Sequence, residues 1–247
     1  MLTNAILQTL FESCHNLAEI EIYGVSLSSI AELIDEPILC SYYPTLTQLT
    51  VYGDGVTAST LRDIFTYCTN LREISLSCAD INDETIMVLS QNCCKLESLV
   101  LDCYITKLTA KGLLEVATYC TNLTSLQLLH VSIGDEFLIQ LSQHCINLKH
   151  IYLDHCGYTA TDNTDTSLTD SDSGAGTGRS PLSESDRSSI SETDRSSISE
   201  TGIVAVLEKC IKLKVLTIIK CNVTITHTLH MIEQGKLYPH VSFAMEE

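Results

Sequence analysis

One pattern recurs along almost the whole chain: a leucine, two variable residues, then two apolar residues with one variable residue between them. Its seven copies are LAEIEI, LTQLTV, LREISL, LESLVL, LTSLQL, LKHIYL and LKVLTI, which begin at Leu17, Leu46, Leu71, Leu96, Leu123, Leu148 and Leu213. The first five steps between these leucines are 29, 25, 25, 27 and 25 residues. A short segment that returns at such a period is typical of stacked structural units rather than of a domain with one central core.

The second half of each unit reads as a helix. A cysteine stands three residues before most of the leucines, namely Cys14, Cys68, Cys93, Cys120, Cys145 and Cys210, with Tyr43 in the remaining copy. Seven and four residues before each cysteine the chain is apolar, as at Leu61 and Ile64 before Cys68. Together with the cysteine, this spacing indicates one face of a helix.

Each unit is therefore predicted to be a short strand, a loop and an amphipathic helix. Neither element can bury its apolar side alone, so stacking joins the strands into a parallel sheet and the helices into an outer layer. We expect an α/β leucine-rich-repeat solenoid of about seven repeats. It forms a horseshoe with the parallel sheet on the concave face and the helices on the convex face.

Further residues share one family pattern. Cys78, Cys103, Cys156 and Cys221 follow the strands, Ile81-Asn82-Asp83 and Ile105-Thr106 resemble an Ile-Thr-Asp turn, and Gly112 and Gly202 stand near the helix starts. With the repeat itself, they make the chain resemble the cysteine-containing leucine-rich repeats of F-box/LRR (RNI-like) proteins and of their F-box-less relatives of the antagonist-of-mitotic-exit type. The resemblance covers nearly all of residues 1–247 except 157–200, and it implies a single solenoid.

No F-box is visible. It would be a helical segment ahead of the repeats, but the first repeat helix is expected to begin near Thr3. Two interpretations stay open: the chain is a fragment that has lost an N-terminal F-box, or it resembles the F-box-less group.

The sixth repeat contains an insertion. The step from Leu148 to Leu213 is 65 residues, about 40 more than one repeat, and the excess runs from Gly157 to Glu200. This tract is rich in Ser, Thr, Asp, Glu and Gly and includes SESDRSSI followed by SETDRSSI. Such a composition cannot bury enough surface to offset its ordering entropy, so residues 157–200 are predicted to be disordered. Because SETGIVAVLEKCIKL aligns with TAKGLLEVATYCTNL, the tract separates a strand from its own helix and marks no domain boundary.

The insertion offers candidate phosphoacceptors. An acidic residue stands three positions after Ser183, Ser189, Ser191 and Ser197, which is typical of acidophilic kinase sites, and Ser180 precedes a proline. The alternative is a solvated low-complexity expansion without a regulatory role.

Charge and leader signals restrict the partners and the compartment. The chain has 31 acidic and 14 basic residues, a net charge of −17, which disfavours nucleic acid and anionic membranes as partners. The N-terminus lacks the features of a signal peptide, and no segment has the roughly 18 apolar residues of a spanning helix. We expect a cytoplasmic or nuclear protein with reduced thiols.

Catalytic, cofactor and metal sites are not expected. Cys93-Cys94 and the group His150, Asp154, His155 and Cys156 are the nearest approach to a metal site, but cysteines that recur at the repeat period are better explained as small buried side chains. The sequence has no glycine-rich phosphate loop, no G-x-S-x-G and no H-E-x-x-H, so an enzyme is not predicted.

Binding residues are expected on the concave strand face, at the variable positions of the pattern. The candidates are Tyr23, Tyr52, Glu73, Asp102, Leu129, His150, Tyr152 and Asp154. Stacking should make Tyr23 and Tyr52 close neighbours, and aromatic anchors are typical of interfaces. Several acids are counted on the same face, namely Glu19, Glu21, Glu73, Glu97, Asp102 and Asp154, and these favour a basic partner segment. The alternative is the mixed composition of any solvated sheet.

These features predict a protein–protein interaction module that needs no cofactor. The family resemblance implies a substrate-recognition component in SCF-type ubiquitin-dependent protein degradation, with SCF ubiquitin ligase subunits as further partners. The alternative hypothesis is a regulatory scaffold or inhibitor of a signalling protein, unconnected with ubiquitin.

Overall fold

The computed structural model describes residues 16–23, 45–53, 58–77, 81–103, 108–156, 197–221, 223 and 226–246. Several predictions lie outside these residues: the first repeat helix near Thr3 with Cys14, the position of Tyr43, Cys78, the turn at 105–106, and the candidate phosphoacceptors Ser180, Ser183, Ser189 and Ser191.

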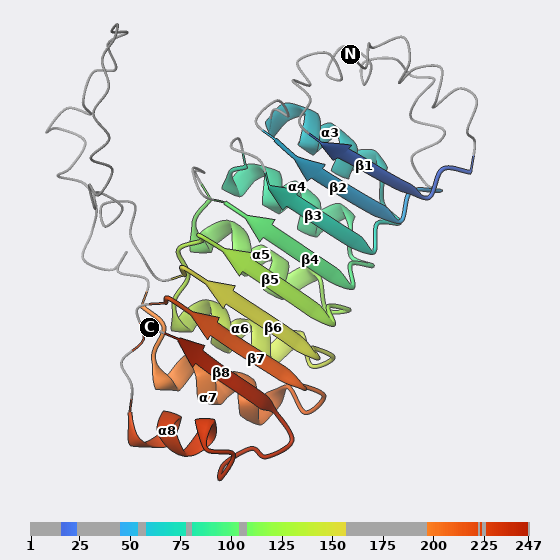
Figure 1. The fold of residues 1–247 in the computed structure, drawn as a ribbon. Helices are drawn as coiled ribbons and strands as arrows, with labels where there is room; N and C mark the ends of the chain where they lie inside the picture. The colour runs from blue at the N-terminus through green and yellow to red at the C-terminus, as the bar shows by residue number, and fades with distance from the viewer. Residues whose placement is uncertain are drawn as a thin grey trace, which may run out of the picture.

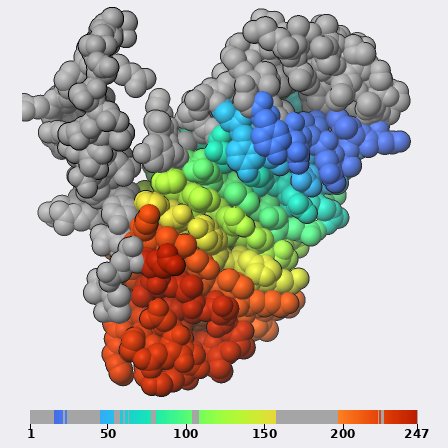
Figure 2. Space-filling view, in the orientation of Figure 1, coloured from blue at the N-terminus to red at the C-terminus, as the bar shows by residue number. Residues whose placement is uncertain are grey.

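The described strands form one parallel sheet in chain order. They are β1 (Glu19–Tyr23), β2 (Gln48–Tyr52), β3 (Glu73–Ser77), β4 (Ser98–Asp102), β5 (Ser125–Leu129), β6 (His150–Asp154), β7 (Val215–Ile219) and β8 (Ser242–Glu246). Every neighbouring pair is parallel and in the same register, so equivalent positions of successive repeats lie side by side. Figure 1 shows this ladder, and Figure 2 shows the repeats as successive bands of colour. The predicted leucine-rich-repeat solenoid is confirmed.

The sheet contains one strand more than the seven expected. Residues 242–246 pair in parallel with β7 and extend the sheet, although the pattern had suggested only a terminal cap there. The register places His240 where the earlier repeats have their first leucine, so the leucine pattern does not identify this strand. Phe243 and Met245 occupy the inward positions and are partly buried against the core.

The helices cover one face of the sheet (Figure 1). They are α3 (Ala58–Tyr67), α4 (Asp83–Asn92), α5 (Ala110–Tyr119), α6 (Asp135–His144), α7 (Glu200–Lys209) and α8 (His227–Glu233). Polar residues in extended conformation begin several of them: Asn82 caps α4, Thr109 caps α5 and Ser199 caps α7 through their side-chain oxygens. These caps satisfy amide groups that have no partner within the helix.

The core lies between the sheet and the helices and is almost wholly aliphatic. In the third repeat, the pattern residues Leu71, Ile74 and Leu76 are buried, and Ile86 and Leu89 of α4 face them. Burying each such side chain contributes about 1.5–3 kcal/mol relative to exposure. Because every repeat packs mainly on its two neighbours, this stabilisation accumulates along the array.

The repeat cysteines end the helices. Cys93, Cys120, Cys145 and Cys210 are buried, and each backbone N–H donates to a carbonyl oxygen four residues earlier, at 2.8–2.9 Å. The Cys145 thiol also points at the preceding repeat, 3.5 Å from the carbonyl oxygen of Cys120. Burial raises the pKa of the Cys145 thiol to about 12. These side chains therefore act as small, protonated core residues between repeats.

An aspartate at the start of one helix caps the next helix. The Asp83 carboxylate accepts hydrogen bonds from Thr109 N (2.8 Å), Thr109 Oγ1 (2.7 Å) and Gly112 N (3.3 Å). A Cβ at Gly112 would lie only 2.9 Å from Asp83 Cα, so the close helix approach requires glycine there. The glycine and the aspartate of the family pattern thus form one contact between repeats.

The same contact joins α6 to α7 across the insertion. Ser199 donates from its backbone N and its Oγ to the two carboxylate oxygens of Asp135, at 2.7 and 2.5 Å. Ile198 just before it is buried and forms a parallel bridge with Val223. The prediction that residues 157–200 are disordered is therefore wrong for 197–200, because these residues already belong to the repeat.

Candidate partner-binding face

The face of the sheet opposite the helices carries the third, fifth and seventh positions of the pattern, and we call it the sheet face. Along each strand, buried residues alternate with partly or fully exposed ones, as in β6, where Ile151 and Leu153 are buried and His150, Tyr152 and Asp154 are not. The sheet face corresponds to the predicted concave face. All eight candidate residues occupy these positions.

An aromatic pair lies at the N-terminal end of this face. Tyr23 and Tyr52 end neighbouring strands in register, and their rings stack with centroids 5.3 Å apart and planes only 4° from parallel. The two side chains remain 58% and 40% exposed. Tyr23 Oη donates to the Glu21 carboxylate at 3.3 Å, and Tyr52 Oη lies 3.4 Å from Ser75 Oγ. The predicted adjacency is present, and it creates a preordered aromatic surface.

A second group lies on β6. His150 is exposed, and Tyr152 Oη donates to Asp154 Oδ2 at 3.5 Å. Burial, together with the nearby Asp154 carboxylate, raises the pKa of the Tyr152 phenol, which therefore remains a hydrogen-bond donor. In the seventh-position column Leu129 stands between Asp102 and Asp154. Four strand spacings of about 4.8 Å place this group roughly 19 Å from Tyr52.

Two histidines extend this second group, and the pattern did not select them. His130 and His155 directly follow β5 and β6, both with positive φ (58° and 51°), and their rings stack at a centroid distance of 4.8 Å. His130 Nδ1 lies 3.1 Å from Asp102 Oδ1, and His155 Nδ1 lies 2.7 Å from Asp154 Oδ1. They occupy equivalent positions of consecutive repeats, and this is the signal in the sequence that could have paired them.

The acidic side chains assigned to this face divide into two sets. Glu19, Glu21 and Glu73 line the open side of β1 and β3 and are exposed. Glu97, counted with them from the sequence, instead precedes β4 and pairs with Arg72 of the neighbouring repeat. Glu73 stays close to the tyrosine pair, since its strand is hydrogen-bonded to β2.

Metal ligation and membrane insertion were also considered. Within the described part of the chain, no group of three or more His, Cys, Asp or Glu side chains is arranged to hold a metal ion. No helix among those residues is both long and apolar enough to cross a bilayer.

Comparison with known proteins supports the fold and the family resemblance. No protein-family profile matches the chain. An F-box protein of Arabidopsis thaliana is 28% identical over 151 residues, which is 54% of this chain and 30% of that protein. In the solved structures, a chain of the yeast Rad7 and Elc1 complex superposes with a TM-score of 0.50 at 16% identity, covering 98% of this chain and 66% of that one.

These similarities place the chain among F-box/LRR-type proteins as distant relatives of this kind, and the resemblance read from the residues is confirmed at that level. The chain spans less than a third of the F-box relative and about two thirds of the yeast chain. The structural match concerns the solenoid fold.

Proposed function

We propose that this chain is a protein-recognition module of an F-box-type ubiquitin ligase system, acting without catalysis in the cytoplasm or the nucleus. The stacked pair Tyr23–Tyr52 carries the recognition part of the proposal, because two ordered aromatic rings are left exposed on the open side of the sheet. Ring pairs of this kind bury much area at little entropic cost and are common anchors at interfaces. The similarity to an F-box protein supports the ubiquitin part.

The partner segment is proposed to be basic and to lie across the sheet face. Glu21 and Glu73 flank the tyrosine pair, while Asp102 and Asp154 flank Leu129 at the other end. A Lys- or Arg-rich segment about 19 Å or more in length could contact both groups. His150 and Tyr152 would contact the partner beside the second group.

The binding face can be tested by paired variants of the full chain. Tyr52→Ala and Tyr152→Ala should each weaken partner binding by about 1–3 kcal/mol without unfolding the array. The matched control is Lys111→Ala, an exposed residue of α5 on the helix side. Quantitative affinity purification compares the proteins captured by wild type with those captured by each variant. If Lys111→Ala abolishes capture while both tyrosine changes are silent, the partner binds the helices instead.

The identity of the captured proteins tests the second part. Cullin and adaptor subunits that co-purify with wild type support a place in an SCF-type or elongin-C-type ligase, the latter suggested by the yeast Rad7 and Elc1 complex. Capture of a GTPase or a kinase without ligase subunits would favour the alternative, a regulatory scaffold that acts by covering its partner. Whether an N-terminal F-box exists in a longer protein decides how docking to the adaptor occurs.

A further inference from the structure

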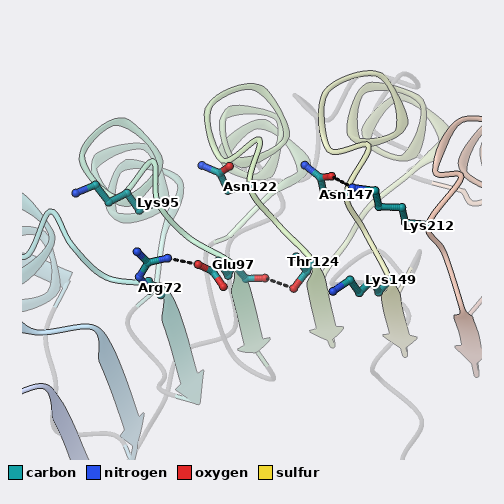
Figure 3. Close-up of a pocket in the computed structure, with 8 residues that line it drawn as sticks. All are labelled: Arg72, Lys95, Glu97, Asn122, Thr124, Asn147, Lys149 and Lys212. Atoms are coloured by element: carbon teal, nitrogen blue, oxygen red, sulfur yellow. Dashed lines mark hydrogen bonds and ion pairs between the residues drawn. The ribbon is translucent and has the colours of Figure 1, made fainter.

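A second surface lies where the chain leaves each helix and enters the next strand (Figure 3). It is a groove of about 440 Å³ that runs across several repeats. Four basic side chains line it, Arg72, Lys95, Lys149 and Lys212, against one acidic side chain, Glu97. The groove therefore has a surplus of three positive charges in a chain whose net charge is −17.

The backbone fixes the spacing of these side chains. Glu97 N donates to Arg72 O, Thr124 N to Glu97 O and Lys149 N to Thr124 O, each at 2.8 Å. These residues precede successive strands and form one row along the groove. Lys95 and Lys212 belong to a second row, two positions earlier in their repeats, with Asn122 and Asn147 between them (Figure 3). The charges therefore recur at the strand spacing of about 4.8 Å or its multiples.

Most of this positive charge is oriented but not neutralised. Lys95 Nζ donates to Asn70 Oδ1 at 2.5 Å, and Lys212 Nζ donates to Asn147 Oδ1 at 2.7 Å. Amide oxygens carry no net charge, so they fix the position of an ammonium group and leave its charge available to a ligand. Lys149 is exposed and forms no ion pair with any described residue. Arg72 differs, because Glu97 pairs with it.

We propose that this groove binds a short acidic peptide segment of a partner protein in extended conformation, separately from the sheet face. Lys95 and Lys212 stand three repeats apart, a distance of about 14 Å. In an extended peptide, side chains at i and i+4 point the same way and are about 13–14 Å apart. Two carboxylates with that spacing reach both lysines, and Lys149 neutralises a third between them. The amide nitrogen of Asn147 faces the groove as a donor for the peptide backbone (Figure 3).

The size and surroundings of the groove favour a peptide over nucleic acid. The surplus of three charges is small, and the rest of the chain is strongly acidic, so a long polyanion would be repelled beyond the groove. A short segment with two or three acids avoids that repulsion.

The test uses a fluorescein-labelled nonapeptide of Ser and Gly with Glu at its third and seventh positions, titrated with the full chain at low salt. Lys149→Glu combined with Lys212→Glu should weaken binding about tenfold or more. Glu97→Gln should strengthen it by a few-fold, because Arg72 loses its partner. Lys111→Glu changes the net charge of the chain on the opposite, helix side and should have little effect. Tyr52→Ala should leave peptide binding unchanged, which separates this result from the sheet-face proposal.

Three results would overturn the proposal, provided that circular dichroism shows each variant folded. One is a peptide affinity that does not respond to the lysine changes. Another is an equal loss with Lys111→Glu, which would mean that only net charge matters. The third is tighter, lysine-dependent binding of a single-stranded oligonucleotide in the same assay. A peptide with its two Glu residues adjacent should bind more weakly, since it cannot reach both Lys95 and Lys212.

Discussion

The carboxylate of Asp135 holds the repeat that follows the insertion, and Asp135→Ala tests how much stability it supplies. The change removes the acceptor of two hydrogen bonds from Ser199, at 2.7 and 2.5 Å. A hydrogen bond to a charged group contributes about 1.5–3 kcal/mol, and partial exposure places this pair toward the lower end. We expect the free energy of unfolding to fall by about 2–4 kcal/mol. Part of the cap survives, because Ser199 Oγ still accepts from Thr201 N.

A matched variant, Asp83→Ala, removes the equivalent cap where no insertion intervenes. There the chain runs 7 residues from the end of β4 to the capped Thr109, whereas it runs 45 residues from the end of β6 to Ser199. Closing the longer connection costs about 1.6 kcal/mol more. Loss of the Asp135 cap should therefore open α7 and the repeats after it before the N-terminal repeats.

Urea unfolding followed by circular dichroism measures the global effect, and hydrogen exchange locates it. Asp135→Ala should reduce amide protection in α7 and β7 more than in α4, whereas Asp83→Ala should affect α4 and α5 most. Asp135→Asn, which keeps one acceptor oxygen, should recover about half of the loss. A destabilisation below about 0.5 kcal/mol, or equal loss of protection in every repeat, would refute the proposed role of this contact.

The remaining predictions concern the insertion, the thiols and the glycine contact. Replacing residues 157–196 with a short Gly/Ser linker should leave the melting temperature within a few degrees in calorimetry, and a collapse would show that the tract packs on the array. A thiol-reactive dye should label Cys94 rapidly and Cys145 only after denaturation, since the first is exposed and the second buried; rapid native labelling of Cys145 would contradict this. Because the folded pKa of Cys145 is about 12 and unfolded thiols ionise near 8.5, the unfolding free energy should fall as pH rises above about 8.5, and a constant value in urea titrations up to pH 10 would count against it. Gly112→Ala should lower the melting temperature by several degrees, because a clash costing about 1–3 kcal/mol with Asp83 outweighs the helix-propensity gain of about 1 kcal/mol, and a stabilised variant would show that the helices separate easily.

The regular parts of the fold could be predicted from the sequence because one residue type marks each structural need. Leucine marks the inward strand positions and cysteine the helix ends, so the register and the pairing of Tyr23 with Tyr52 follow directly from the repeat period. β8 was missed because His240 replaces the leading leucine. The end of the insertion was placed four residues too late because composition alone did not distinguish Ser199, a helix cap, from the serines before it.

The groove had no comparable signal. Its lysines are about 25 or more residues apart, and no local run of basic residues precedes or follows any of them. They come together only because the strands stack in register, and their effect depends on which neighbours are neutral amides. The His130–His155 pair was missed for the same reason, since each histidine looks isolated in the sequence.

The strand order, which follows the chain without a crossover, has a consequence for synthesis on the ribosome. Each new repeat can dock on the completed edge of the previous one as soon as it emerges. At roughly 5–20 residues per second, the extra 40 or so residues after β6 delay its partner β7 by about 2–8 seconds. During that interval the nascent chain presents the unpaired edge of β6, the kind of edge that other strands can join. The polar insertion thus lengthens the period in which a growing chain would benefit from a chaperone.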